Sequence, residues 1–231
     1  MSHEIIFQPF LITDIREALD VSELAFAALN RFLYTSPLSE KSLDVMAALR
    51  EGQFKEPHVK EFKAVHAATG KLVGLTRWAV YAEDQVVEKS VEEVVEARLA
   101  ADIPERRDDV ARAIYTAIEL GKREFLGVGT LENNEKGIIL RKRVELEAIL
   151  VHPDYQRKGI AKRLLAWGIE EAERLGVDLW LQATEEGRPV YERAGFQPLR
   201  EVKVVCEGVG ESPVTFMMLP AKLAPRVREE I

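Results

Sequence analysis

A strand, a glycine-containing turn and an amphipathic helix follow one another over residues 144–175, and this unit limits the folds open to the chain. The segment Val144–Val151 is apolar and rich in β-branched residues, and Gly159–Leu175 carries apolar residues at helical spacing. A second strand, Val177–Gln182, follows directly. Strands that alternate with helices predict a sheet covered by helices, so we expect an α/β fold.

The remaining segments add strands and helices to this unit. Residues 4–11 read as a strand, and helical spacing follows it. Residues 59–66 and 71–81 read as a β-hairpin around Thr69–Gly70. After residue 182 we expect a short helix at 188–193 and strands around 196–205 and 214–219.

The segment Glu83–Glu124 is rich in acidic residues and has apolar positions at helical spacing on both sides of Pro104. We interpret it as a helical insertion, because about 40 residues are few for an independent core. We expect one domain over residues 1–220 that contains this insertion at 83–124, and a peripheral tail at 221–231. Residues 127–137 are expected to form a loop.

The composition argues against several classes of protein. The 39 acidic and 32 basic residues give a net charge of −7, which disfavours a surface for nucleic acid or an anionic membrane. There is no apolar run long enough to cross a bilayer and no signal-peptide pattern at the amino terminus. Cys206 has no second cysteine to pair with, and the four histidines are dispersed, so we expect no metal site. These features predict a cytoplasmic protein.

The turn before the helix has the chemistry of a phosphate site. The first turn of a helix exposes unpaired amides and the positive end of the helix dipole, and small residues let a phosphate approach. Basic side chains add positive charge here. The alternative is that the glycine only eases the turn and that the basic residues are solvated. The residues concerned are Gln156, Arg157, Lys158, Gly159, Ile160 and Ala161.

Two motifs resemble those of the GNAT superfamily of acyl-CoA-dependent N-acetyltransferases. The run 156–161 is similar to its Q/R-x-x-G-x-G/A signature, with the usual V-x-P before it at 151–153. The stretch Gly187–Phe196 resembles its second motif, a tyrosine-bearing helix that ends at Gly-Phe. The resemblance implies a mixed, mostly antiparallel central sheet with helices on both faces, plus the helical insertion. It is clear over residues 144–199.

The resemblance also implies a cofactor, acetyl-CoA, held between the strands 144–151 and 177–182 where they splay apart. Main-chain groups of Ile149, Leu150 and Val151 would pair with the pantetheine, and the amides of residues 157–161 would hold the diphosphate. Strand edges that part expose donors and acceptors that need partners, which agrees with this expectation.

Acetyl transfer to an amine needs a deprotonated nucleophile, a polarised carbonyl and a proton for the leaving thiolate. The resemblance implies that Tyr191 approaches the CoA sulfur, and we expect it to be the general acid, protonated at neutral pH. The alternative is a tyrosine packed under the sheet. We expect a main-chain N–H near Leu150 or Val151 to meet the carbonyl oxygen.

Glu145 and Glu147 alternate with apolar residues, so both project from one face of the strand. Either is a candidate to take the proton of the amine through water, and Glu145 matches the position of a family base better. The alternative is that both pair with Arg or Lys from neighbouring strands. Trp78 and Tyr81 are candidates to line the acceptor pocket.

These expectations describe an N-acetyltransferase that moves the acetyl group of acetyl-CoA to a primary amine by direct attack. The acceptor is a small-molecule or peptide amine, and the acidic balance slightly favours a small cationic one. A homodimer is compatible with the sequence. Two alternatives stay open: a noncatalytic acyl-CoA-binding regulatory module, and a scaffold whose insertion recruits a protein partner.

Overall fold

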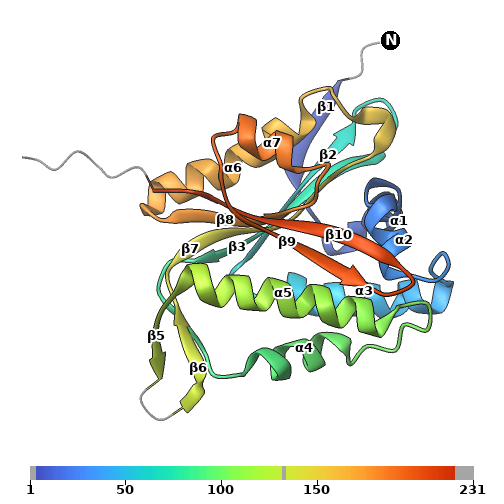
Figure 1. Ribbon diagram of the computed structural model, residues 1–231. Helices are drawn as coiled ribbons and strands as arrows, with labels where there is room; N and C mark the ends of the chain where they lie inside the picture. Colours follow the sequence, from blue (N-terminus) through green and yellow to red (C-terminus); the bar gives the residue numbers. More distant parts are fainter. Residues whose placement is uncertain (1–3, 132–133, 222–231) are drawn as a thin grey trace, which may run out of the picture.

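The computed structural model describes residues 4–131 and 134–221 (Figure 1). Its strands are β1 (Ile5–Pro9), β2 (Val59–His66), β3 (Leu72–Tyr81), β4 (Gln85–Val87), β5 (Gly127–Leu131), β6 (Asn134–Leu140), β7 (Arg143–Val151), β8 (Asp178–Ala183), β9 (Gln197–Cys206) and β10 (Gly210–Leu219). Its α-helices are α1 (Ile15–Ala25), α2 (Ala27–Leu33), α3 (Glu40–Phe54), α4 (Val91–Leu99), α5 (Asp108–Leu126), α6 (Ile160–Leu175) and α7 (Arg188–Arg193).

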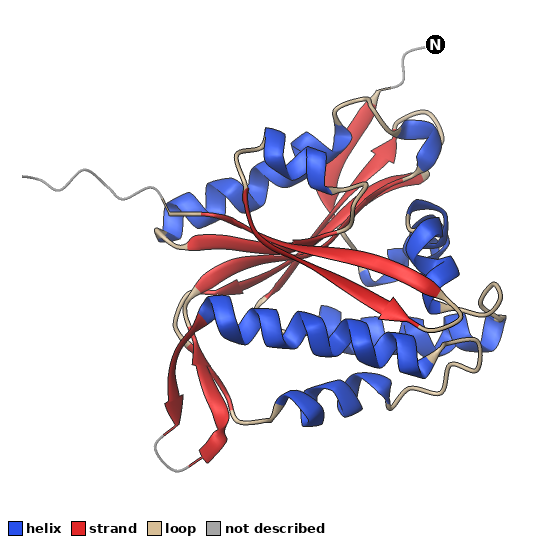
Figure 2. Ribbon diagram, viewed as in Figure 1, coloured by secondary structure: helices blue, strands red, loops and turns tan. Residues whose placement is uncertain are grey.

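The central sheet has seven strands in the order β1-β2-β3-β7-β8-β10-β9. Its neighbours pair antiparallel except for β7 and β8, which are parallel. Helices α6 and α7 lie on one face, and α1, α3 and α5 lie on the other (Figure 2). The predicted mixed, mostly antiparallel sheet with helices on both faces is therefore confirmed.

The two faces of the sheet carry separate cores. Trp78 of β3 is fully buried against α6, where its six-membered ring lies over Gly168. Trp180 of β8 is fully buried on the opposite face, stacked on Phe216 with 5.5 Å between ring centroids. Trp78 is therefore a core residue of the α6 face, as is common for large aromatic side chains.

The predicted insertion at 83–124 contains β4, α4 and most of α5, and β4 joins β6 and β5, which follow it, in a small sheet of order β4-β6-β5. The predicted loop over 127–137 is wrong for the described residues, since β5 and β6 pair there; residues 132 and 133 lie outside them. The cause is tertiary: Ile138, Ile139 and Leu140 also pair with β4, and Leu140 packs on the buried Leu126.

The chain ends that we predicted are only partly described. Residues 1–3 and 222–231 lie outside the described ranges, so the peripheral tail and the domain boundary at residue 220 stay predictions. Among the described residues, the helices are all too short or too polar to cross a membrane.

The contact between α6 and β3 requires a glycine. A Cβ at Gly168 would lie 2.3 Å from the ring of Trp78, which is fully buried, so the ring or the helix would have to shift. Gly168→Ala should therefore lower the free energy of unfolding by about 1–3 kcal/mol, the usual cost of overpacking a core. Urea denaturation measures it.

Gly52→Ala is the matched control, because a Cβ there in α3 meets nothing within 4 Å. This variant should be more stable than the wild type by up to about 1 kcal/mol, through helix propensity alone. Equal effects of the two substitutions would contradict the proposed contact.

Candidate active site

The parallel ladder between β7 and β8 stops partway along the strands. Its last rung joins Leu146 to Leu181. Beyond it, β7 continues along β3 as far as Val151, and β8 continues along β10. A β-bulge marks the same point, because Glu147 has no partner on β3. Such a bulge bends its strand, so the two strands part and the edge of β7 faces a gap.

The gap contains the three residues that we expect to pair with the pantetheine. Ile149, Leu150 and Val151 pair with β3 on one side, and none of them pairs with β8 on the other. Gln156, from the turn, donates a hydrogen bond from its side-chain amide to the Val151 carbonyl over 3.2 Å. An open strand edge of this kind can add an extended ligand through main-chain hydrogen bonds.

The turn between β7 and α6 presents main-chain amides to solvent. Arg157 and Gly159 both have positive φ values, of 60° and 77°. Gly159 is the N-cap of α6 and provides no side-chain cap. Within the described residues, the amides of 157–162 donate no hydrogen bond. They remain the unsatisfied donors of a helix start, which favour an anion.

The surroundings of these amides fit a diphosphate. A Cβ added at Gly159 would meet nothing within 4 Å, so the space beside the turn is open. Arg157, Lys158 and Lys162 are exposed around it. Lys158 donates a hydrogen bond to the Asp154 carbonyl over 3.0 Å. The predicted phosphate-binding residues are thus together at one end of the gap.

Glu145 lies on the opposite side of the sheet from α6 and is only 3% exposed. Its carboxylate is 2.7 Å from Lys122 of α5 and 3.1 Å from Arg143. Burial raises the pKa of this carboxyl, but the two cations outweigh burial and bring the pKa to about 2. A carboxylate held in this way is a weak base without access to water, so the geometry argues against Glu145 as the base.

Glu147 lies on the same face and is more accessible, with 28% of its side chain exposed. Its carboxylate is 2.8 Å from the Nε of Arg77, and Arg77 also donates to Gln53 of α3. Arg50 pairs with the buried Glu61 at 2.8 Å and completes this group. Glu147 is therefore the better candidate base of the two glutamates. The alternative of pairing with cations from neighbouring strands holds for Glu147, whose partner Arg77 is on β3, whereas the cations of Glu145 come from α5 and from β7 itself.

Tyr191 belongs to α7, and its side chain packs into the core on the other face of the sheet. It is 6% exposed and packs edge-on against Phe196. Burial raises the pKa of its hydroxyl, so it is protonated at neutral pH. Tyr191 and Glu147 thus lie on opposite faces of the sheet, and Tyr191 is packed in the core as the alternative describes.

Several residues of the site have no motif that predicts them. Lys122 comes from the insertion, Arg50 from α3, and Arg77 from the middle of β3. Tyr81, a candidate for the acceptor pocket, stacks on His58 and carries the Arg143 guanidinium 4.2 Å above its ring. Burial raises the pKa of Tyr81 to about 12.

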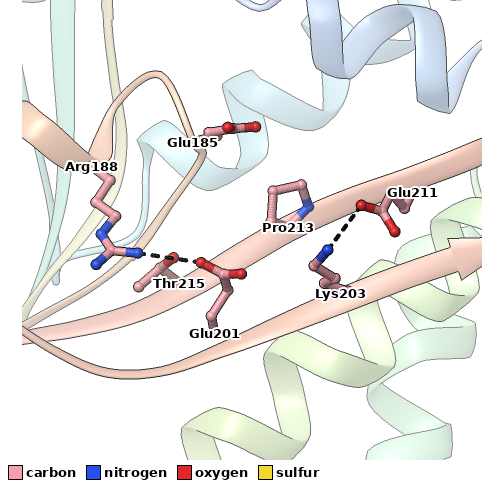
Figure 3. A pocket seen from close by; sticks show the side chains of 7 residues that line it. All are labelled: Glu185, Arg188, Glu201, Lys203, Glu211, Pro213 and Thr215. Atoms are coloured by element: carbon pink, nitrogen blue, oxygen red, sulfur yellow. Dashed lines mark hydrogen bonds and ion pairs between the residues drawn. The ribbon is translucent and has the colours of Figure 1, made fainter.

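A polar cavity of about 380 Å³ lies away from the gap (Figure 3). It is formed by β9, β10 and the start of α7, and it is crossed by the ion pairs Arg188–Glu201 and Lys203–Glu211. None of the predicted site residues lines this cavity. Its charged side chains largely neutralise one another, so we do not place the site here.

Comparisons with known proteins agree with this geometry. The family model described as Acetyltransferase (GNAT) family matches residues 79–196, about half of the chain. The chain is 35% identical over 72 residues to the uncharacterized N-acetyltransferase YafP of Escherichia coli (strain K12), covering 31% of this chain and 45% of YafP. It is 33% identical over 66 residues to an acetyltransferase of Stachybotrys chartarum, covering 29% of each. The chain thus spans less than half the length of these curated relatives.

Solved structures extend the likeness to the whole fold. Mosquito arylalkylamine N-acetyltransferase like 5b has a TM-score of 0.59 at 11% identity, covering 94% of this chain and 99% of that one. The Salmonella typhimurium acetyltransferase yncA, solved with its cofactor acetyl-CoA, has a TM-score of 0.54 at 13% identity, covering 96% of each. This chain belongs to the GNAT family of acetyltransferases.

The ion pairs of Glu145 make the free energy of unfolding depend on pH in the acid range. The pKa of this carboxyl is about 2 in the fold and 4.5 ordinarily, so its contribution is complete above pH 4.5 and is lost as pH falls toward 2. Over that window the wild type should lose about 3 kcal/mol more unfolding free energy than Glu145→Gln. Urea denaturation at several pH values measures both.

Glu51→Gln, on the exposed side of α3, controls for the change in net charge and should follow the wild type. Parallel curves for the wild type and Glu145→Gln would show that these ion pairs do not stabilise the fold.

Proposed function

We propose that this protein is an N-acetyltransferase that uses acetyl-CoA and a primary amine. The observation that carries the proposal is the set of unpartnered amides at 157–162, which lies at the open end of the gap. A diphosphate on these amides leaves the edge of β7 free for the pantetheine, which runs toward Glu147. The bound acetyl-CoA of the Salmonella relative supports the same cofactor here.

Glu147 and Tyr191 each carry out one of the two proton transfers. Acetyl-CoA supplies an activated acyl group: as the amine nitrogen forms the new C–N bond, the C–S bond breaks and the thiolate leaves with the electron pair. Glu147 takes the proton that the nitrogen loses, through water. Tyr191 donates a proton to the thiolate and regains one from solvent. The products are an amide and free CoA.

The acceptor in this proposal is a small-molecule or peptide amine. The glutamates provide no reason to prefer a small cationic acceptor, because they and Glu61 already pair with cations of the chain, namely Arg50, Arg77, Lys122 and Arg143. The cytoplasmic location and the homodimer stay predictions.

Acetyl-CoA titration of Gly159→Trp tests the phosphate site. A bulky side chain at this turn fills the space that the diphosphate needs, so calorimetry should detect no binding. Gly176→Trp is the matched control: it lies at the other end of α6, also has a positive φ, and has equally open surroundings. It should bind as the wild type does, and equal binding by both variants would contradict the site.

Turnover decides whether the bound acetyl group is transferred. The wild type should release free thiol from acetyl-CoA only when an amine from a panel is present. Thiol release that stays at background with every amine, despite tight acetyl-CoA binding, would instead support a noncatalytic binding module.

Tyr191→Phe tests the general acid. It should lower kcat by about 10- to 10,000-fold, the usual span for acid–base catalysis, and leave acetyl-CoA affinity unchanged. Tyr115→Phe, on α5 beneath Arg98, is the control and should keep full activity. An unchanged kcat for Tyr191→Phe would remove this hydroxyl from the mechanism.

A further inference from the structure

Gln182 is the first residue of β8 beyond the ladder. Because the last rung joins Leu146 to Leu181, one more rung would have joined Glu147 to Gln182. Gln182 alternates with Trp180, which opposes Glu145 across the ladder, so it shares the face of the two glutamates. Glu147 and Gln182 therefore flank the narrow end of the gap, one on each strand.

The side-chain amide of Gln182 has a donor without an acceptor. Its Nε2 is buried and makes no hydrogen bond within the described residues. The indole nitrogens of Trp78 and Trp180 are also buried and unpartnered, but they belong to packed cores. A buried donor left unpaired destabilises a fold, so its presence beside a ligand gap calls for a ligand oxygen.

The position of this donor matches the acyl end of the cofactor. Four residues of β7, about 13 Å at the usual strand rise, separate Val151 from Glu147. A pantetheine that starts at the α6 amides and follows this edge directs its thioester toward the bulge. There Glu147 offers an acceptor for the amine N–H, and Gln182 offers a donor for an oxygen.

We propose that Gln182 Nε2 donates a hydrogen bond to the acyl oxygen of acetyl-CoA and stabilises the negative charge that this oxygen gains during attack. The inference rests on the proposed acetyl transfer. As the amine lone pair bonds to the acyl carbon, the C=O π electrons move to the oxygen; when they return, the C–S bond breaks. Gln182 transfers no proton. It acts in place of the main-chain N–H predicted near Leu150 or Val151, which lies three to four residues away from Glu147 along β7.

Gln182→Leu tests this role at nearly constant volume. Loss of one such donor should lower kcat by about 100-fold. The melting temperature should stay the same or rise, because the variant also removes an unpaired buried donor. A merely structural glutamine would behave in the opposite way, with a lower melting temperature and an unchanged kcat.

A binding experiment tests the contact without turnover. S-ethyl-CoA, a thioether, lacks the acyl oxygen, so the wild type should bind acetyl-CoA about 3- to 10-fold more tightly than S-ethyl-CoA. Gln182→Leu should bind the two equally, and Gln197→Leu, at an exposed glutamine of β9, should keep the preference.

The outcomes separate the two proposals. An equal affinity of the wild type for both compounds, or a preference that survives in Gln182→Leu, overturns the role of Gln182. A preference that depends on Gln182 without amine-dependent thiol release supports the contact and overturns the proposed transfer. Absence of acetyl-CoA binding by the wild type overturns both.

Discussion

The parting of β7 from β8 is the constraint on which the rest of the site depends. Each strand keeps its antiparallel partner, β3 or β10, and gives up the parallel pairing after Leu146. Antiparallel pairing is slightly more stable per residue than parallel pairing, so this is where the sheet separates at least cost. The unpaired edge then leads directly through the turn to the bare amides of α6, which places two ligand-binding features in line.

The two glutamates of β7 show how surroundings separate chemically identical groups. Glu145 lies where the ladder is still closed, under α5, and its two cations hold it ionised as part of the fold. Glu147 lies at the bulge, where it has no partner residue on β3 and its side chain reaches water. Two glutamates that are two residues apart thus have different roles: Glu145 is part of a buried ion-pair group, and Glu147 is the candidate base. Their surroundings cause this difference.

The local parts of this structure could be predicted from the sequence, and the long-range parts could not. The strand, turn and helix over 143–175 follow from periodicity and Gly159, and the motifs at 156–161 and 187–196 indicate the family. The pairing of Glu145 with Lys122 depends on where α5 packs, and no spacing encodes it. The strands β5 and β6 form because β6 pairs with both β5 and β4, and Gln182 lies at the gap only because the ladder ends at Leu181.

Helix α5 of the insertion packs directly on the central sheet. Gly121 of α5 lets the helix approach Phe216 of β10 so closely that a Cβ would lie 2.2 Å from its ring. One residue later, Lys122 reaches the buried Glu145. Removing α5 would expose the aromatic core and leave a buried carboxylate with Arg143 as its remaining cation, and an incompletely paired buried charge is strongly destabilising. Helix α5 therefore contributes to the core of the central sheet.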